Sequence, residues 1–308
     1  MVQENCLKKP KIVVIVGPTA SGKTATSISL AKRFNGEIIS ADSMQIYKHM
    51  NIGTAKVTKT EMAGVPHHMI DIVQPTKNYS VAMWVDETRQ LISDIISRSK
   101  IPFIVGGTGL YVTSLLKGYT FHNVPENKGL REHYYTLYKE QGIEPLYNEI
   151  ILKSPDMAKG LDKNKTKAVI RTLEIIHGEE NKCSCDRGEE YDYLLIGLAD
   201  DREKLYERIN ARVDRMIDAG LIDEFKDLIE NHGLTKTCQS AGAIGYRELF
   251  SYIEGSSTLD ETITLLKQHS RNYAKRQLTW MRKMDNIKWL TREDNIEKVV
   301  SDFLGDKK

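Results

Sequence analysis

The stretch IVVIVGPTASGKTATSISLAKRF, residues 12–34, predicts a buried strand, a glycine-rich turn and the first turns of a helix. The opening run is short, apolar and β-branched, and Gly17-Pro18 ends it, which is typical of a strand inside a sheet. Apolar side chains then recur at the helical period, as at Ile28 and Ala31. The fold is therefore expected to begin with a strand–loop–helix unit.

Within that stretch, GPTASGKT matches the phosphate-binding pattern G-x-x-x-x-G-K-[ST]. Its glycines let successive backbone N–H groups point at phosphate oxygens, and the N-terminus of the following helix adds positive charge. Lys23 supplies a cation, and the Thr24 hydroxyl is placed for Mg²⁺, the one cofactor expected. A loop that matches by chance is the alternative. The expected phosphate-binding residues are Gly17, Pro18, Thr19, Ala20, Ser21, Gly22, Lys23 and Thr24.

Further strand and helix signals alternate along the first third of the chain. Short apolar strands are predicted at residues 36–40 and 101–105, and an amphipathic helix is predicted at residues 81–97. This alternation favours a parallel sheet with helices on both faces. The predicted fold class is therefore α/β, a P-loop parallel sheet flanked by helices, with an inserted helical domain.

The insertion is placed by a change of pattern after Gly118. Residues 119–193 carry helical stretches and loops without a convincing buried strand, whereas YLLIGLA at residues 193–199 again predicts a strand. The simplest organisation is one α/β catalytic core, residues 1–118 and 194–308, interrupted by a helical insertion at 119–193.

Composition is typical of a soluble globular protein. The chain has 308 residues, 28% charged and 40% hydrophobic, and no apolar run near the ~20 residues that a membrane helix needs. The N-terminus lacks the apolar stretch of a signal peptide, so a cytoplasmic protein without a membrane partner is expected. The four cysteines suggest no disulfide framework. Cys183 and Cys185, with His177 nearby, allow a metal site, but idle thiols are the preferred interpretation.

The acid expected beside a phosphate cradle stands in an unusual place. Many NTPases position Mg²⁺ and water with an Asp at the end of a hydrophobic strand, but the strand at 101–105 ends in the string GGT. Asp42 instead follows the strand at 36–40, which puts it at the carboxyl edge of a parallel sheet, where ligands bind. An acid there can ligate a metal or act as a general base, and a helix N-cap is the alternative.

Basic side chains concentrate near the C-terminus. Residues 265–292 hold eight Lys or Arg and a single acid, although the whole chain has a formal net charge of only +2. Basic and aromatic side chains together suit RNA phosphates and unstacked bases, whereas a solvated helix with buried aromatics is the alternative. One helix face is expected to carry Lys267, Arg271, Lys275 and Arg282, and another Tyr273 and Trp280.

Seven short strings follow one another along the chain. They are GPTASGKT at 17–24, SADSMQIY at 40–47, GVPHHMIDI at 64–72, GGTGLY at 106–111, IRTLE at 170–174, AIGYRE at 243–248 and YAKRQLTWMR at 273–282. In this order the chain resembles the bacterial tRNA dimethylallyltransferases, also called tRNA isopentenyltransferases. The first string alone is weakly specific, but the set is highly specific and extends over residues 12–292. The family also has a helical insertion in its core.

The resemblance implies a prenyl transfer. Members of the family move a dimethylallyl group from dimethylallyl diphosphate to the N6 amine of the adenosine 3′ of the anticodon in tRNA, and release diphosphate. The phosphate cradle would then hold the diphosphate of the substrate. Asp42 matches the family's general base and Thr108 the residue that positions the acceptor, while Lys23 would stabilise the leaving charge.

The matched motifs also imply substrate contacts. Either Arg208 or Arg212 would reach the diphosphate and Arg212 is favoured, with ordinary surface charge as the alternative for both. Relatives often carry adjacent arginines where this chain has Lys167-Ala168, so one phosphate contact is missing or moved. Gln45 is expected to read the adenine edge. The residues expected to bind tRNA are Asp42, Ser43, Met44, Gln45, Thr108, Arg131, Lys167, Arg171, Gly245, Tyr246, Arg247, Lys275, Arg276, Gln277, Trp280 and Arg282.

Other functions stay open at this point. A prenyltransferase acting on free AMP, ADP or ATP would need neither the basic segment nor the insertion. A P-loop kinase or an ATP-dependent RNA-binding switch would usually have the acidic strand that is missing here. His67 and His68 are expected to form hydrogen bonds, since adjacent side chains cannot both face one ion. The expected partners are the tRNA anticodon stem-loop and dimethylallyl diphosphate, bound by a monomer.

Overall fold

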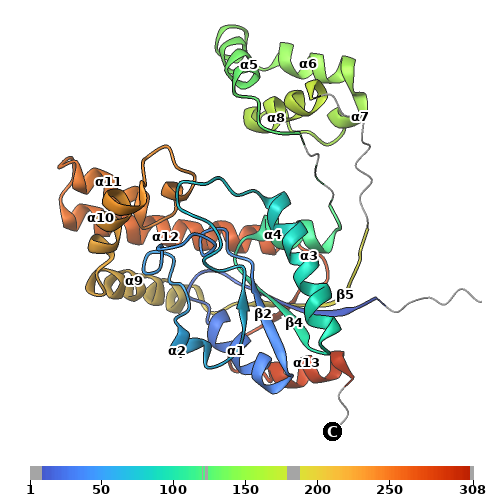
Figure 1. Ribbon diagram of the computed structural model, residues 1–308, viewed down its shortest axis with the longest axis vertical. Coiled ribbons are helices and arrows are strands. Elements are labelled where there is room, and N and C mark those ends of the chain that lie inside the picture. The colour runs from blue at the N-terminus through green and yellow to red at the C-terminus, as the bar shows by residue number, and fades with distance from the viewer. Residues whose placement is uncertain (1–8, 120, 122–123, 179–187, 306–308) are drawn as a thin grey trace, which may run out of the picture. The chain divides into compact units, whose positions relative to one another are not determined.

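Two compact units make up the chain (Figure 1). Unit 1 is formed by Met1–Tyr119 and Arg187–Lys308, and unit 2 by Thr120–Asp186. The structure, a computed structural model, describes residues 9–119, 121, 124–178 and 188–305.

The return of the chain to unit 1 comes earlier than the expected boundary at residue 194. The strand expected from residue 193 begins at Asp192, whose N–H donates to the Pro10 carbonyl at 3.0 Å. Just before it, Glu190 forms an ion pair with Arg89 at 2.8 Å. These contacts attach the segment before the strand to the sheet and its covering helix.

Among the described residues, six strands form one parallel sheet in the order β3-β2-β4-β1-β5-β6. The strands are β1 (Lys11–Val16), β2 (Gly36–Ser40), β3 (His67–His68), β4 (Ile101–Gly106), β5 (Asp192–Leu198) and β6 (Lys288–Leu290). The central strand β1 is buried along its length after Lys11, as a strand covered on both faces must be. The strands expected at the start of the stretch 12–34, at 36–40 and at 101–105 are confirmed.

Helices cover both faces of this sheet. The helices of unit 1 are α1 (Lys23–Arg33), α2 (Lys59–Met62), α3 (Val81–Ser97), α4 (Gly109–Leu116), α9 (Arg202–Asp218), α10 (Leu221–His232), the 3₁₀ turn η1 (Ser240–Gly242), α11 (Tyr246–Ile253), α12 (Leu259–Met281) and α13 (Ile296–Leu304). The predicted amphipathic helix at 81–97 is α3, and Ser80 caps it by accepting the Met83 N–H.

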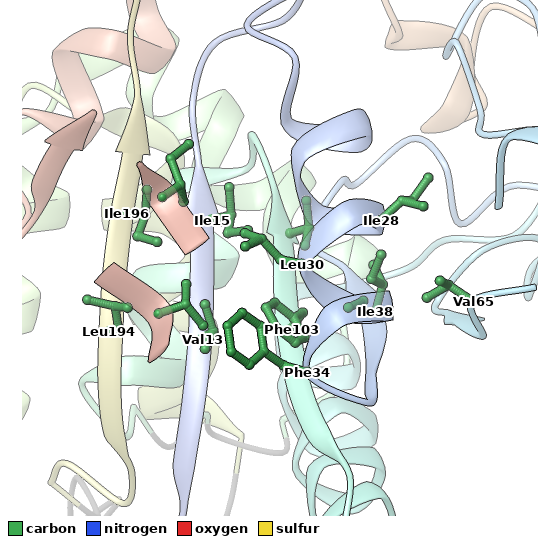
Figure 2. Packing of buried hydrophobic residues seen from close by; sticks show 14 of the residues in the cluster. Val13, Ile15, Ile28, Leu30, Phe34, Ile38, Val65, Phe103, Leu194 and Ile196 are labelled. Atoms are coloured by element: carbon green, nitrogen blue, oxygen red, sulfur yellow. The ribbon is translucent and has the colours of Figure 1, made fainter. Parts of the chain in front are cut away.

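The largest core lies between the sheet and helices α1 and α13 (Figure 2). Val13 and Phe103, from neighbouring strands, point toward Leu30 and Phe34 of α1, and Val300 of α13 is buried in the same cluster. The strand residues in between, such as Val14 and Ile104, are equally buried but point to the opposite face, because side chains alternate along a strand. Helix α3 contacts β2 and β4 from that face.

The buried acid Glu37 links strand β2 to the edge strand β3 and to the residues that follow α3. Glu37 of β2 is 1% exposed and pairs with Arg98, with Lys100 at 2.7 Å and with His68 Nε2 at 2.7 Å. The Arg98 guanidinium, followed by the other two partners, holds the pKa of Glu37 far below its usual range. His67 Nδ1 lies 2.9 Å from the Val65 carbonyl. The expected hydrogen-bonding roles of both histidines are thus observed.

Helices are the regular elements of the described part of unit 2. Its helices are α5 (Lys128–Gln141), α6 (Glu144–Lys153), α7 (Pro155–Ala158) and α8 (Thr166–His177). A small core of its own brings together Tyr134, Leu146, Ile150, Val169 and Leu173. Cys183 and Cys185 lie outside the described residues, so the interpretation of those thiols has no structural counterpart. Nowhere in the described ranges is a helix both long and apolar enough to cross a bilayer.

Candidate active site

A cavity of about 300 Å³ lies in unit 1 at the carboxyl edge of the sheet. It is lined by the P-loop, by the ends of β2 and β4, by the loop that follows Gly53, and by α9 and α12. Open α/β sheets bind ligands at this edge, and the volume is in the range of small-molecule sites. Its polar lining residues include Thr19, Lys23, Thr24, Asp42, Arg212 and Tyr273.

The P-loop, residues 17–24, has the backbone that an anion requires. Gly22 has a φ of 90° and Ala20 a φ of 63°, both in the left-handed region. Gly17 packs so tightly that an added Cβ would lie 2.7 Å from the Leu198 carbonyl oxygen of β5. Helix α1 then begins without a side-chain cap, which leaves its first N–H groups to a ligand.

Lys23 is held inside the cavity by the loop itself. Its Nζ donates to the carbonyls of Gly17 at 2.9 Å and Pro18 at 2.7 Å. Burial first, and then the nearby charge of Arg212, lower the pKa of Lys23 to about 7, while the Asp42 carboxylate acts in the opposite direction. A bound anion would favour the protonated form of Lys23, so the site is poised to gain a positive charge when an anion enters.

Asp42 follows the end of β2 and lines the same cavity as the P-loop. Its Oδ1 accepts the Met44 N–H at 2.9 Å, which fixes the carboxylate in a turn. The Thr108 hydroxyl accepts the Ser43 N–H at 3.0 Å and lies 3.4 Å from the Ser43 Oγ. The loops after β2 and β4 are thus joined beside the cavity by side chains that the motifs singled out.

The two candidate arginines of α9 have different surroundings. Arg212 lines the cavity, and its Nη2 donates a long bond of 3.4 Å to the Thr54 carbonyl. Arg208 instead donates to the Ala20 carbonyl at 3.1 Å and pairs with Asp200. The geometry therefore favours Arg212 as the ligand-facing arginine and makes Arg208 an outer support of the P-loop.

Comparison with known proteins identifies the family. The family model described as IPP transferase matches residues 45–284. A tRNA dimethylallyltransferase from Bacillus pumilus is 49% identical over 290 residues, which cover 92% of this chain and 91% of the relative. The chain belongs to the tRNA dimethylallyltransferase family. The resemblance seen in the seven strings is confirmed.

Solved structures agree with this family assignment. The full-length tRNA isopentenylpyrophosphate transferase from Bacillus halodurans is 43% identical, with a TM-score of 0.73 over 97% of this chain and 98% of that one. A eukaryotic dimethylallyltransferase acting on tRNA is 29% identical, with a TM-score of 0.81 over 97% of this chain and 80% of that one. The predicted α/β fold class is therefore confirmed.

Several residues that the family motifs assign to tRNA lie at the surface of unit 1. Arg247, Lys275, Arg276 and Arg282 are exposed, and Arg276 also lines the cavity. Trp280 is 44% exposed, although its Nε1 donates to the Thr113 hydroxyl at 3.2 Å. These side chains offer positive charge and an aromatic face beside the cavity, and their contact with tRNA stays a prediction.

Part of the expected basic face of α12 is used inside the protein. Lys267 pairs with Asp214 at 2.6 Å, and Arg271 donates to Asn210 Oδ1 at 2.6 Å. Both acceptors belong to α9, which packs along α12. The first two residues of the predicted basic face are thus bonded to α9, and contact of this face with RNA stays a prediction.

Three residues expected to bind tRNA have other surroundings in this structure. Tyr246 is fully buried and its hydroxyl donates to Glu224 at 2.7 Å, while Gly245 is buried with a φ of 109°. Gln277 is 7% exposed and bonds to two backbone groups of the site. Protein atoms cover these three residues in this structure, and their contact with tRNA stays a prediction.

The segment after Asp42 faces both the cavity and the protein. Met44 and Gln45 line the cavity. The Gln45 Oε1 accepts the Ser40 hydroxyl at 3.2 Å, and its Nε2 lies 3.5 Å from the Thr54 and Ala55 carbonyls. Adenine recognition by Gln45 stays a prediction. Binding adenine would require the Gln45 Nε2 to give up its two long bonds to the Thr54 and Ala55 carbonyls.

Sequence reasoning missed Glu224 and Arg292. Glu224 of α10 accepts the N–H groups of Asn51, Ile52 and Gly53 at 2.8–3.1 Å, and so holds the loop that lines the cavity. Arg292 donates to the Ser21 carbonyl at 3.0 Å on the outside of the P-loop. The sequence around Glu224 does not indicate this role, because the N–H groups that it binds lie far away in the sequence. Ile52, for example, is 172 residues from Glu224.

In unit 2, two predicted tRNA-binding arginines share one buried acid. Glu174 of α8 is 1% exposed, and both Arg131 at 2.8 Å and Arg171 at 3.2 Å pair with it. Each arginine keeps about a third of its side chain exposed. Lys167 is exposed in the first turn of α8. The acid orients the arginines without removing them from the surface.

Proposed function

We propose that this protein transfers a dimethylallyl group from dimethylallyl diphosphate to the N6 amine of the adenosine 3′ of the anticodon in tRNA, and releases diphosphate. Family membership supports this activity. The observation that carries it is that Lys23 of the P-loop and Asp42 face one cavity, while β4 ends in glycines and Thr108 instead of an acid. A cation for a leaving group and an acid for a proton thus line one small-molecule space.

The leaving diphosphate is assigned to the P-loop side of the cavity. The uncapped N-terminus of α1 supplies N–H donors, and Lys23 and Arg212 supply positive charge. Charge on the diphosphate increases as the carbon–oxygen bond breaks. Donors placed in advance stabilise that charge more in the transition state than in the bound substrate, which is what accelerates a reaction.

The acceptor amine is assigned to the Asp42 side. Its nitrogen forms a bond to the allylic carbon, the bond from that carbon to the diphosphate oxygen breaks, and the electron pair leaves with the diphosphate. The amine proton passes to the Asp42 carboxylate, which the Met44 N–H holds through Oδ1. Thr108 supports this arrangement by accepting the Ser43 N–H.

Magnesium fits this chemistry as an ion carried largely by the substrate. Thr24 and Asp42 offer oxygen ligands in the cavity, and the described residues contain no group of three His, Cys, Asp or Glu that could hold a metal by themselves. Mg²⁺ is commonly bound by one or two protein oxygens together with substrate phosphates and water. When bound, the ion would neutralise part of the diphosphate charge.

The tRNA side is assigned to the exposed end of α12 and to unit 2. A base in the anticodon loop must leave its stack to be modified, which costs a few kcal/mol. Phosphate contacts from Lys275, Arg276 and Arg282, with Trp280 as a stacking surface, would offset that cost. Arg131, Lys167 and Arg171 are the corresponding candidates in unit 2. The expected working form is a monomer.

Transfer of a labelled dimethylallyl group tests this proposal. The enzyme is incubated with labelled dimethylallyl diphosphate, Mg²⁺ and tRNA that lacks the modification, without ATP, and with AMP offered in a parallel reaction. We expect label on tRNA alone. Label on AMP alone would identify a small-nucleotide prenyltransferase, and an absolute need for ATP would favour the kinase or switch alternatives.

A further inference from the structure

One buried amide joins two loops of the active site. The Gln277 Oε1 accepts the Thr19 N–H at 2.9 Å, and its Nε2 donates to the Gly107 carbonyl at 3.1 Å. Thr19 belongs to the P-loop, and Gly107 directly precedes Thr108. The loop assigned to the diphosphate and the loop assigned to the acceptor are therefore bonded to the same side chain.

The fit around this amide is close. A Cβ at Gly107 would lie 2.1 Å from the Gln277 Nε2, so the backbone can approach the amide only because residue 107 is a glycine. The side chain is 7% exposed, and its two bonds span 258 and 170 residues of sequence. Water has little access to replace either bond, so losing the amide would leave the Thr19 N–H and the Gly107 carbonyl without that partner.

The helix that carries Gln277 is anchored independently of the two loops. Thr258 and Glu261 form a capping box at its start, and Lys267 and Arg271 bond to α9. Further along, Ala274 is buried against α9. This anchoring makes α12 a fixed support from which one side chain can set the positions of two loops.

We propose that Gln277 is a positioning residue that sets the separation between the P-loop and the Thr108 loop, and that it does not contact tRNA. The identity of the two ligands rests on the proposed function, whereas the bridge itself is a property of the fold. Diphosphate binding should depend on Gln277 even when no tRNA is present, because the Thr19 N–H belongs to the cradle.

The test compares Gln277→Met with a matched control, Gln268→Met, an exposed glutamine on the same helix. Affinity for inorganic diphosphate with Mg²⁺ is measured without tRNA, and tRNA affinity is measured without diphosphate. Gln277→Met should weaken diphosphate binding by roughly five- to hundredfold, the range for a lost buried hydrogen bond, and lower kcat. Its tRNA affinity and every constant of Gln268→Met should stay within about twofold of the wild type.

A second variant separates positioning from simple structural support. In Gln277→Glu the introduced carboxylate can still accept the Thr19 N–H but faces the Gly107 carbonyl without a proton to donate. Its diphosphate affinity relative to the wild type should recover as the pH falls and the carboxyl becomes protonated. The pH dependence of diphosphate binding by Gln277→Glu also tests the positioning role if Gln277→Met does not fold.

Two results would overturn the proposal. One is weaker tRNA binding with unchanged diphosphate binding, which would make Gln277 an RNA contact. The other is diphosphate binding by Gln277→Met, or by Gln277→Glu at every pH, that matches the wild type. Failure of the wild-type enzyme to prenylate tRNA would count against the proposed function instead, because the diphosphate titration would still report on the bridge.

Discussion

At the scale of single residues, Asp42 and Lys23 share a cavity but are held in different ways. The Asp42 carboxylate has one oxygen in a backbone turn, whereas the Lys23 ammonium is satisfied by two loop carbonyls. A ligand that takes the place of those carbonyls must offer Lys23 better acceptors, and phosphate oxygens do so. On the proposed function, the charge of Lys23 serves ligand binding and the carboxylate of Asp42 accepts the amine proton.

Replacing Asp42 by Asn removes the charge of the side chain while keeping its size and its hydrogen bond to Met44. An amide oxygen can still accept the Met44 N–H, so the turn should survive while the proton acceptor is removed. We expect kcat for prenyl transfer to fall about 10²- to 10⁴-fold and tRNA affinity to change little. Single-turnover transfer and filter binding measure the two quantities. Equal losses in both would mean that Asp42 acts through structure.

Binding of diphosphate should take up a proton above neutral pH. Burial lowers the pKa of Lys23 to about 7 in the free protein, so at pH 8 the side chain is mostly neutral and must be protonated beside the anion. Calorimetry at pH 8 in buffers of different ionisation enthalpy should show this uptake, which should fade toward pH 6. Lys23→Met should lack this contribution. Identical uptake by the variant and the wild type would refute the assignment.

Arg212 and Arg208 lie on the same helix, α9, so substitutions at the two positions can be compared directly. Arg212→Ala should raise the KM for dimethylallyl diphosphate by about tenfold or more, because its guanidinium faces the cavity. Arg208→Ala removes a hydrogen bond to the outer backbone of the P-loop, so a smaller rise is expected. Steady-state kinetics on both variants decides between them, and a larger effect at Arg208 would reverse the assignment.

The site could be predicted from the sequence to the extent that its residues lie in local motifs. The P-loop, Asp42 and Arg212 follow from short strings whose backbone context is predictable. Tyr246 and Gln277 lie in equally strong strings, yet their side chains turn inward to partners far away in the sequence. Spacing alone does not reveal whether a polar residue in a motif faces a ligand or the protein.

At the scale of elements, α12 is bonded to α9 through Lys267 and Arg271, and nearer its C-terminus it carries the exposed residues Lys275 and Arg276. Replacing Lys275 and Arg276 together by Ala should weaken tRNA binding. The slope of log affinity against log salt should fall by up to roughly 0.7–0.9 for each phosphate that the variant no longer neutralises. Lys267→Ala is the control, because Lys267 already pairs with Asp214. A salt slope that stays the same in the double variant would remove this segment from the interface.

The long and regular elements were predictable, and the short ones were not. β1, β2, β4 and α3 have the apolar runs or period that burial on known faces requires. The edge strands, β3 with two histidines and β6 with the sequence KWL, are too short and too polar for any period to appear. Pairing with a neighbouring strand, rather than local preference, makes them strands.

At the scale of the whole molecule, the ion pairs of Glu37 should make stability depend on acid. The folded-state pKa of Glu37 is lowered by Arg98, so its contribution is complete above the unfolded value near 4.3 and disappears as the pH falls below it. Glu37→Gln should reduce the free energy of unfolding at neutral pH by about 2–4 kcal/mol, since its partners are partly solvent-screened.

Urea unfolding at several pH values measures this dependence. The difference between the wild type and Glu37→Gln should shrink as the pH falls from about 5 to 3. Glu297→Gln provides a control, since the exposed pair of Glu297 with Arg33 should contribute less than about 1 kcal/mol. A difference that stays constant down to low pH would show that the buried carboxylate is not stabilised as described.

The central claim is that the P-loop cradles a leaving diphosphate and does not cleave a nucleoside triphosphate. Measuring released diphosphate against dimethylallyl groups transferred to tRNA, in the absence of ATP, tests it most directly. The account predicts equal amounts of the two products and a parallel loss of both in Asp42→Asn. Release of orthophosphate, or transfer that begins only when ATP is added, would contradict it.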